Sequence, residues 1–162
     1  MNRRYSPATI LILFAVATCL STRLRAGDEA LKKLSGEVQG KIQENLGGGH
    51  VDDLKVIRID DRLLYIVEID LPGPRKRKLH IAGDGTLLKM VDKMRLQDLP
   101  PPIRATMEPV LASRGRLDGA DRLTADGKVE YHIDFDMPGR VELQLILSET
   151  GEVISRREET DF

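Results

Sequence analysis

Three side chains that can bind metal ions or transfer protons alternate along one short stretch of the chain. His132, Asp134 and Asp136 are separated by single residues, so in a β-strand they would project from one face about 7 Å apart. Imidazole and carboxylate groups at that spacing could hold a divalent cation, with Glu142 across a hairpin as a further ligand. The alternative is an exposed acidic face that contacts a partner, and the stretch alone leaves both possibilities open.

The sequence offers no recognisable catalytic motif. The three histidines stand outside the contexts typical of zinc proteases and nucleophile elbows: His50, His80 and His132. Glu68 and Asp70 alternate like a carboxylate pair, but lysines expected opposite them would keep both ionised, the wrong state for a general acid. The glycines at 47–49 lack the preceding strand and following helix of a phosphate-binding loop. We therefore expect no enzyme activity and no cofactor.

The elements that would position these side chains come from an internal repeat. The segment YIVEIDLPG at 65–73 returns as YHIDFDMPG at 131–139, 66 residues later. The same offset pairs Gly85 with Gly151. Upstream, an offset of 65 matches the apolar positions 31, 34, 38, 42 and 46 with 96, 99, 103, 107 and 111. Self-similarity at a fixed period indicates a repeated supersecondary unit.

Each repeat reads as one helix followed by four short strands. The first helix is expected to begin at a cap by Asp28 and to end at the glycines 47–49. The second follows Asp98, and Pro109 is expected to kink or shorten it. Glycine, proline and aspartate predict the turns, at 60–61, 72–74, 83–85, 126–127, 138–139 and 150–151. We expect an α+β fold of two similar units, 27–93 and 94–162, each a helix packed on a four-stranded antiparallel meander sheet.

The hairpin register predicts which residues face away from the helices. A three-residue loop at 72–74 pairs 71 with 75, 69 with 77, 67 with 79 and 65 with 81, which places the apolar residues of both strands on the helix side. Glu68 then lies opposite Lys78 and Asp70 opposite Lys76. In the second repeat the same register sets Asp136 against Glu142, and Asp134 against Gln144, without a compensating cation across the hairpin.

This charge asymmetry predicts a partner-binding face, because opposed like charges destabilise a strand pair and the fold does not require them. The residues assigned to that face are His132, Asp134, Asp136, Glu142, Lys76 and Lys78. The alternative assignment is a weak divalent-cation site at His132, Asp134, Asp136 and Glu142. A third possibility is an envelope protein with a purely structural role.

The start of the chain has the layout of a secretory signal peptide. Arg3 and Arg4 precede an apolar run at 8–20, and Ala26 offers a small residue for cleavage. This run is shorter than the roughly 20 residues of a membrane span, and no later stretch approaches that length. Residues 1–26 therefore predict export to the periplasm or beyond, with lipid anchoring at Cys19 as a minor alternative.

Removal of residues 1–26 takes four arginines and the only cysteine of the chain. The mature part then holds 21 Lys and Arg against 26 Asp and Glu, a net charge near −5. This acidity argues against nucleic acid as a partner, since nucleic-acid binding favours a basic surface. The mature chain also has no disulfide and no cysteine-built metal site. The oligomeric state is left open by the sequence.

The repeat resembles a PepSY-like domain, and the whole chain resembles the tandem PepSY-like proteins related in shape to β-lactamase-inhibitor protein. The resemblance rests on five short motifs: LQDLP at 96–100, DGKVEY at 126–131, TGEVI at 150–154, LLY at 63–65 and DGTLL at 84–88. It implies exported, non-catalytic modules, some of which inhibit or regulate secreted peptidases. The inhibitors of this shape bind their enzyme through an aromatic-rich concave sheet. In this sequence, the strand positions that face away from the helices contain no aromatic residue. The resemblance thus implies a binding or inhibitory module for another exported protein, with β-lactamase not expected as its target.

Overall fold

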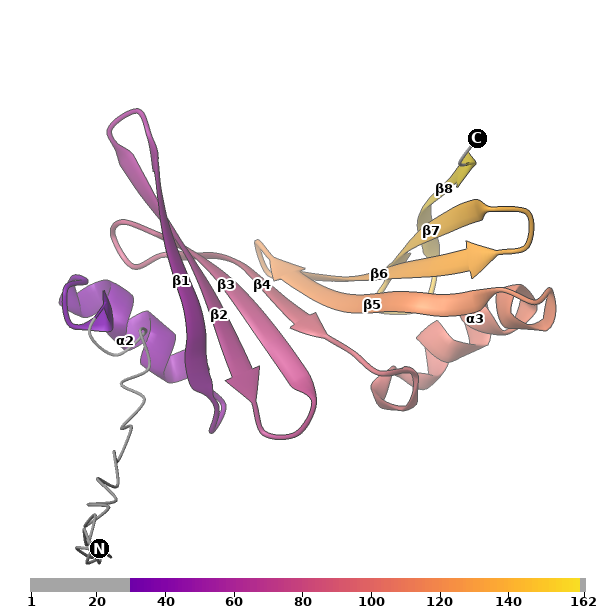
Figure 1. Cartoon of the computed structure of the whole chain (residues 1–162), viewed down its shortest axis with the longest axis horizontal. Helices are drawn as coiled ribbons and strands as arrows, with labels where there is room; N and C mark the ends of the chain where they lie inside the picture. Colours follow the sequence, from indigo (N-terminus) through magenta and orange to yellow (C-terminus); the bar gives the residue numbers. More distant parts are fainter. Residues whose placement is uncertain (1–29, 161–162) are drawn as a thin grey trace, which may run out of the picture.

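The computed structural model describes residues 30–160, which form eight strands and three helical segments in chain order (Figure 1). The first half contains α2 (Gly36–Asn45), β1 (His50–Ile59), β2 (Arg62–Leu71), β3 (Arg75–Ala82) and β4 (Leu87–Lys93). The second half contains the 3-10 helix η1 (Leu96–Asp98), α3 (Pro101–Ala112), β5 (Arg116–Ala125), β6 (Lys128–Met137), β7 (Val141–Ser148) and β8 (Val153–Thr160). The turns between strands lie where glycine, proline and aspartate predicted them.

The prediction of two units, each with its own four-stranded sheet, is wrong. All eight strands form one antiparallel sheet in the order β1 to β8. The two halves are joined because β4 pairs with β5, from Met90 opposite Thr124 to Lys93 opposite Asp121. Two separate sheets would each expose the unpaired backbone groups of an edge strand at this point, and the pairing satisfies both edges. The described chain is therefore mostly β, with α2 and α3 as its two long helices.

The first predicted helix is interrupted within the described residues. Residues 30–31 are helical and are followed by a turn at 32–34. The helix α2 then begins at Gly36, and Ser35 caps it by accepting a hydrogen bond from the Val38 backbone N–H at 3.4 Å. A serine cap satisfies one of the free N–H groups at a helix start, which fixes the boundary here. The predicted cap, Asp28, lies outside the described residues, and the apolar positions 31 and 34 precede α2. The end is as expected, since Asn45 is followed closely by Gly47 at φ +54°.

The second helix runs further than predicted. It begins at Pro101 after η1, as the prolines indicated, but it continues past Pro109 to Ala112. Proline removes the hydrogen bond to the carbonyl group four residues earlier, which here belongs to Ala105. Both Ala105 and Pro109 are exposed, so water can bond to that carbonyl group and the helix need not end.

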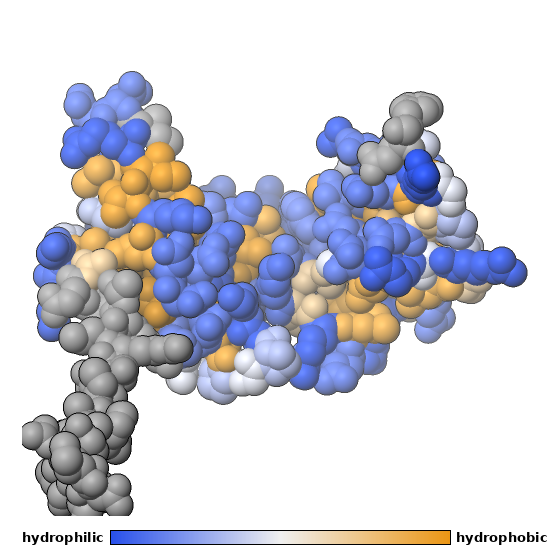
Figure 2. Space-filling view, in the orientation of Figure 1, coloured by the Kyte–Doolittle hydropathy of each residue, from blue (hydrophilic) through white to orange (hydrophobic). Residues whose placement is uncertain are grey.

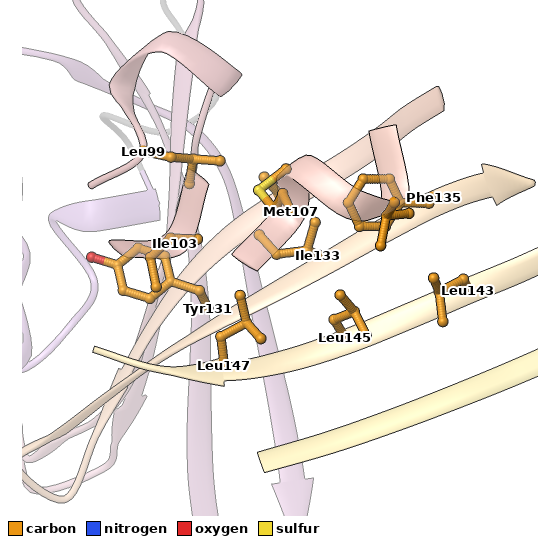
Figure 3. Close-up of a cluster of buried hydrophobic side chains, with 11 residues drawn as sticks. Leu99, Ile103, Met107, Tyr131, Ile133, Phe135, Leu143, Leu145 and Leu147 are labelled. Carbon is orange, nitrogen blue, oxygen red and sulfur yellow. The ribbon is translucent and has the colours of Figure 1, made fainter. Parts of the chain in front are cut away.

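One sheet carries two hydrophobic cores, one beneath each helix. The predicted register between β2 and β3 is confirmed at all four pairs, and it buries Tyr65, Val67, Ile69, Leu79 and Ile81 under α2. Figure 3 shows the second core, where Ile103 and Met107 of α3 meet side chains of β6 and β7. Those strand residues are Tyr131, Ile133, Phe135, Leu143, Leu145 and Leu147.

A polar cluster separates the two cores on the helix side of the sheet. Asp92 of β4 is 8% exposed and accepts two hydrogen bonds from Arg77 of β3, at 2.5 and 3.1 Å. Arg122 of β5 approaches the same carboxylate at 4.0 Å. Arg77 also donates to the backbone carbonyl of Asn45, at the end of α2, at 3.0 Å. The cluster thereby ties three strands and one helix together at the junction of the halves.

The sheet bends, and both helices lie on its outer side (Figure 1). The helix-free surfaces of the two halves lie on the inside of the bend, and the space-filling outline dips between the two raised ends (Figure 2). This arrangement leaves one continuous sheet face open to solvent.

We predict that Gly151→Ala destabilises the protein more than Gly139→Ala does. Both glycines have positive φ, +82° and +86°, which costs an alanine about 1 kcal/mol. At Gly151 the added Cβ would also lie 2.7 Å from the Pro102 carbonyl oxygen, whereas at Gly139 nothing lies within 4 Å. That backbone clash adds roughly 1–3 kcal/mol. Chemical denaturation of both variants measures the difference, and equal losses would contradict the packing of this turn against α3.

We also predict that Asp92→Ala lowers the free energy of unfolding by about 3 kcal/mol, because it leaves the largely buried Arg77 charge without its partner. The matched control is Glu158→Ala, which removes a carboxylate paired with Arg156 on the exposed edge strand β8. Exposed pairs contribute about 0–1 kcal/mol. Urea titration of both variants checks this, and a loss at Asp92 no larger than at Glu158 would contradict the dependence of the Arg77 charge on this carboxylate.

Candidate functional site

The helix-free face is the candidate site, because the structure places every predicted partner-binding residue on it. Lys76 and Lys78 lie on β3 opposite Asp70 and Glu68 of β2. On β6 and β7, Asp136 lies opposite Glu142, Asp134 opposite Gln144 and His132 opposite Ile146. Both hairpin registers are as predicted. The face nevertheless brings these residues together in two groups, one on each half of the sheet.

The first group is charge-balanced, as the register predicted. Lys78 Nζ lies 2.9 Å from Glu68 Oε1, and Lys76 Nζ lies 3.4 Å from Asp70 Oδ1. Lys76 has a further partner that the sequence did not indicate, Asp52 of β1, at 3.3 Å. Hydrogen bonds to Asp52 and then Asp70 raise the pKa of Lys76, so this ammonium stays charged.

The second group has a smaller excess of negative charge than the pairing of β6 with β7 alone indicated. Arg116 of β5 lies opposite Asp136 and forms an ion pair with it. Asp134 accepts a hydrogen bond from Gln144 Nε2 at 3.0 Å. Sequence reasoning considered only β6 and β7, and it missed Arg116 because the compensating charge comes from the strand on the other side.

A small acidic hollow of about 340 Å³ lies over this second group. Its charged lining residues are Asp118, Asp134, Asp136, Glu142, Glu159 and Arg157. His132 turns toward Glu130, with Nε2 3.3 Å from the carboxylate oxygen. Between residues 30 and 160, no three His, Cys, Asp or Glu side chains come close enough together to hold a metal ion. The four residues proposed for a cation therefore share a face but do not form an assembled site.

A larger open hollow of about 770 Å³ lies over the centre of the face, where the halves meet. Five lysines line it, from β1, β3 and β4: Lys55, Lys76, Lys78, Lys89 and Lys93. Ile66, Val91 and Leu123 provide apolar surface between them, and Asp121 and His132 approach from the second half. Sequence reasoning missed Lys55, Lys89 and Lys93, because they join this surface only through pairing with strands whose registers were not predicted.

The electrostatics of the central hollow follow from partial burial and from the lysines. Burial lowers the pKa of His80, and the nearby Lys89 and Lys78 lower it further. Burial also raises the pKa of Asp121, against the opposing effect of Lys93. His80 is therefore neutral near pH 7, and the positive charge of the hollow comes from its lysines.

The three histidines have different neighbours, although His80 and His132 both line the central hollow. His50 Nε2 is 3.8 Å from Asp70 Oδ2, His80 lies beside Lys78 and Lys89, and His132 contacts Glu130. In the part of the chain that the structure describes, no serine hydroxyl hydrogen-bonds to any of them. Nor does this part contain a helix long and apolar enough to cross a membrane.

Comparison with known proteins identifies the fold. No protein-family model and no curated protein sequence matches the chain. A solved structure of a BLIP-like protein from Bacteroides fragilis is similar over 80% of this chain and 89% of its own, with 14% identity and a TM-score of 0.61. A DUF2874 family protein from Bacteroides uniformis is similar over 76% and 88%, with 14% identity and a TM-score of 0.61.

A candidate periplasmic protein from Bacteroides eggerthii is similar over 78% of this chain and 90% of its own, at 12% identity and a TM-score of 0.62. At these identities the likeness concerns the fold alone. It extends across both halves of the chain, so the single bent sheet with its two outer helices is an architecture shared with these proteins. The BLIP-like shape of the chain is thereby established.

Proposed function

We propose that the protein is an exported, non-catalytic module that binds another exported protein on its helix-free face. The observation that carries the proposal is the face itself: eight strands of one sheet form a continuous, charged surface, bent around a hollow, that neither α2 nor α3 covers. Because antiparallel sheets commonly keep one face in water, the features that favour a binding role are the bend of this face, its central hollow and its charge.

Two observations support export to the periplasm or beyond. Residues 1–26 have the pattern of a signal peptide, and one structural relative is a candidate periplasmic protein. In this proposal the sequence repeats, 27–93 and 94–162, each supply one half of the binding face. PepSY-like identity, which rests on the sequence motifs, belongs to the same proposal.

Inhibition or regulation of an exported enzyme such as a peptidase is the specific form of binding that we favour, because the fold is shared with a BLIP-like protein. The face differs from an aromatic binding surface. The aromatic residues between 30 and 160 are all buried in the two cores: Tyr65, Tyr131 and Phe135. Since interface hot spots favour tryptophan, tyrosine and arginine, we infer that charge contributes a large share of recognition and that binding weakens as salt is raised.

We predict that Asp134→Asn with Asp136→Asn weakens partner capture by about tenfold, by removing two carboxylates of the face. The immobilised protein would retain partners from envelope and culture fractions, identified by mass spectrometry and then titrated. The control, Glu44→Gln with Glu108→Gln, removes the same charge from the exposed surfaces of the two helices on the other side of the sheet.

The comparison of the two double variants decides the placement. A partner lost from the face variant and kept by the helix variant supports binding at the face. A partner retained equally by both variants would exclude the second half of the face as its site. If no protein is retained near physiological salt, the proposal of a tight protein-binding module fails.

A further inference from the structure

We propose that the first half of the helix-free face binds an extended acidic segment of the partner, laid across strands β1 to β4 with an apolar side chain at its centre. This inference rests on the proposed function and specifies the chemistry of its partner. The surface concerned is the cationic row, defined as Lys55, Ile66, His80 and Lys89.

The register places these four side chains in one line across the sheet. Lys55 lies opposite Ile66, Ile66 opposite His80, and His80 opposite Lys89. Neighbouring strands are about 4.8 Å apart, so the two lysines at the ends are separated by roughly 14 Å. All four residues line the central hollow.

The cationic row has an excess of positive charge that the neighbouring row lacks. It contains no carboxylate, whereas the next row pairs Lys78 with Glu68 at 2.9 Å. Lys89 forms no ion pair within 4 Å among residues 30–160, and Lys55 has only an exposed contact with Asp53 at 3.5 Å. Burial lowers the pKa of His80, and the charges of Lys89 and Lys78 lower it further.

The spacing of the row matches an extended peptide. Residues i, i+2 and i+4 of a strand project from one side and span about 13 Å. Acidic side chains at i and i+4 would therefore reach Lys55 and Lys89, while an apolar side chain at i+2 would lie over Ile66 and His80 at the middle of the row. A polyanion without apolar groups would leave this surface exposed to water, so the row favours a polypeptide.

The test uses a fluorescently labelled peptide, Gly-Ser-Glu-Ser-Leu-Ser-Glu-Ser-Gly, titrated with the purified protein while anisotropy is measured. We expect saturable binding that weakens about tenfold in Lys55→Gln with Lys89→Gln. Replacement of both glutamates by glutamine, or of the leucine by serine, should weaken it as well. Binding should also fall when salt is raised to about 0.5 M. The matched control, Lys33→Gln with Lys41→Gln, removes two charges outside the helix-free face and should have little effect.

Three results would each overturn the inference. The first is the absence of saturable binding. The second is equal affinity of the row variant and the control variant for the peptide. The third is an affinity for the glutamine peptide equal to that for the glutamate peptide. Dextran sulfate provides a further check. If it binds through the same lysines while the serine peptide is no weaker than the leucine peptide, the row is a general polyanion site. The proposed function is judged separately, since a captured partner that depends on Asp134 and Asp136 but not on Lys55 and Lys89 would uphold it and exclude this inference.

Discussion

The pairing of β4 with β5 is the constraint on which the rest of the structure depends. It consists of four residue pairs, between 90–93 and 121–124, and it is the ladder that joins the two halves into one sheet. Without it, the halves would be two small helix-and-sheet units, each with a core too small to be more than marginally stable. With it, the uncovered surfaces of both halves become one face, and the central hollow forms over the junction.

The junction is polar where the two cores are apolar. Asp92, Arg77 and Arg122 occupy the helix side of the sheet between the cores. Such a cluster adds little stability compared with well-packed apolar side chains, but its hydrogen bonds require particular partners. Two apolar surfaces can slide past one another, whereas the Asp92 carboxylate is satisfied in one register. The cluster therefore accounts for a defined junction between halves that share no common core.

The repeats agree on their inner face and differ on their outer face. Inward positions are apolar in both halves, because each must bury a core beneath its own helix. The outward positions do not need to be apolar, because they bury no core. They carry an excess of lysine around the central hollow and an excess of carboxylate over β6 and β7. A face with opposite charge at its two halves suits a partner with the reverse arrangement, and it disfavours partners of uniform charge.

The sequence by itself determined what depends on neighbouring residues. The turn residues and the alternation of apolar side chains were enough to predict both hairpin registers, and with them the exposure of Lys76, Lys78, Asp134 and Asp136. Helix boundaries were less predictable, because a turn at 32–34 interrupts the first predicted helix before the Ser35 cap and because solvent exposure makes Pro109 tolerable. Only the tertiary structure decided the single sheet, the pairing of Arg116 with Asp136 and the cationic row. The single sheet depends on β4 meeting β5, two strands that no short turn joins, and no local pattern fixes which edges meet. The other two features lie on strands that short turns do join, but β-bulges shift the register between β3 and β4 and between β5 and β6, and turn residues alone do not predict a bulge.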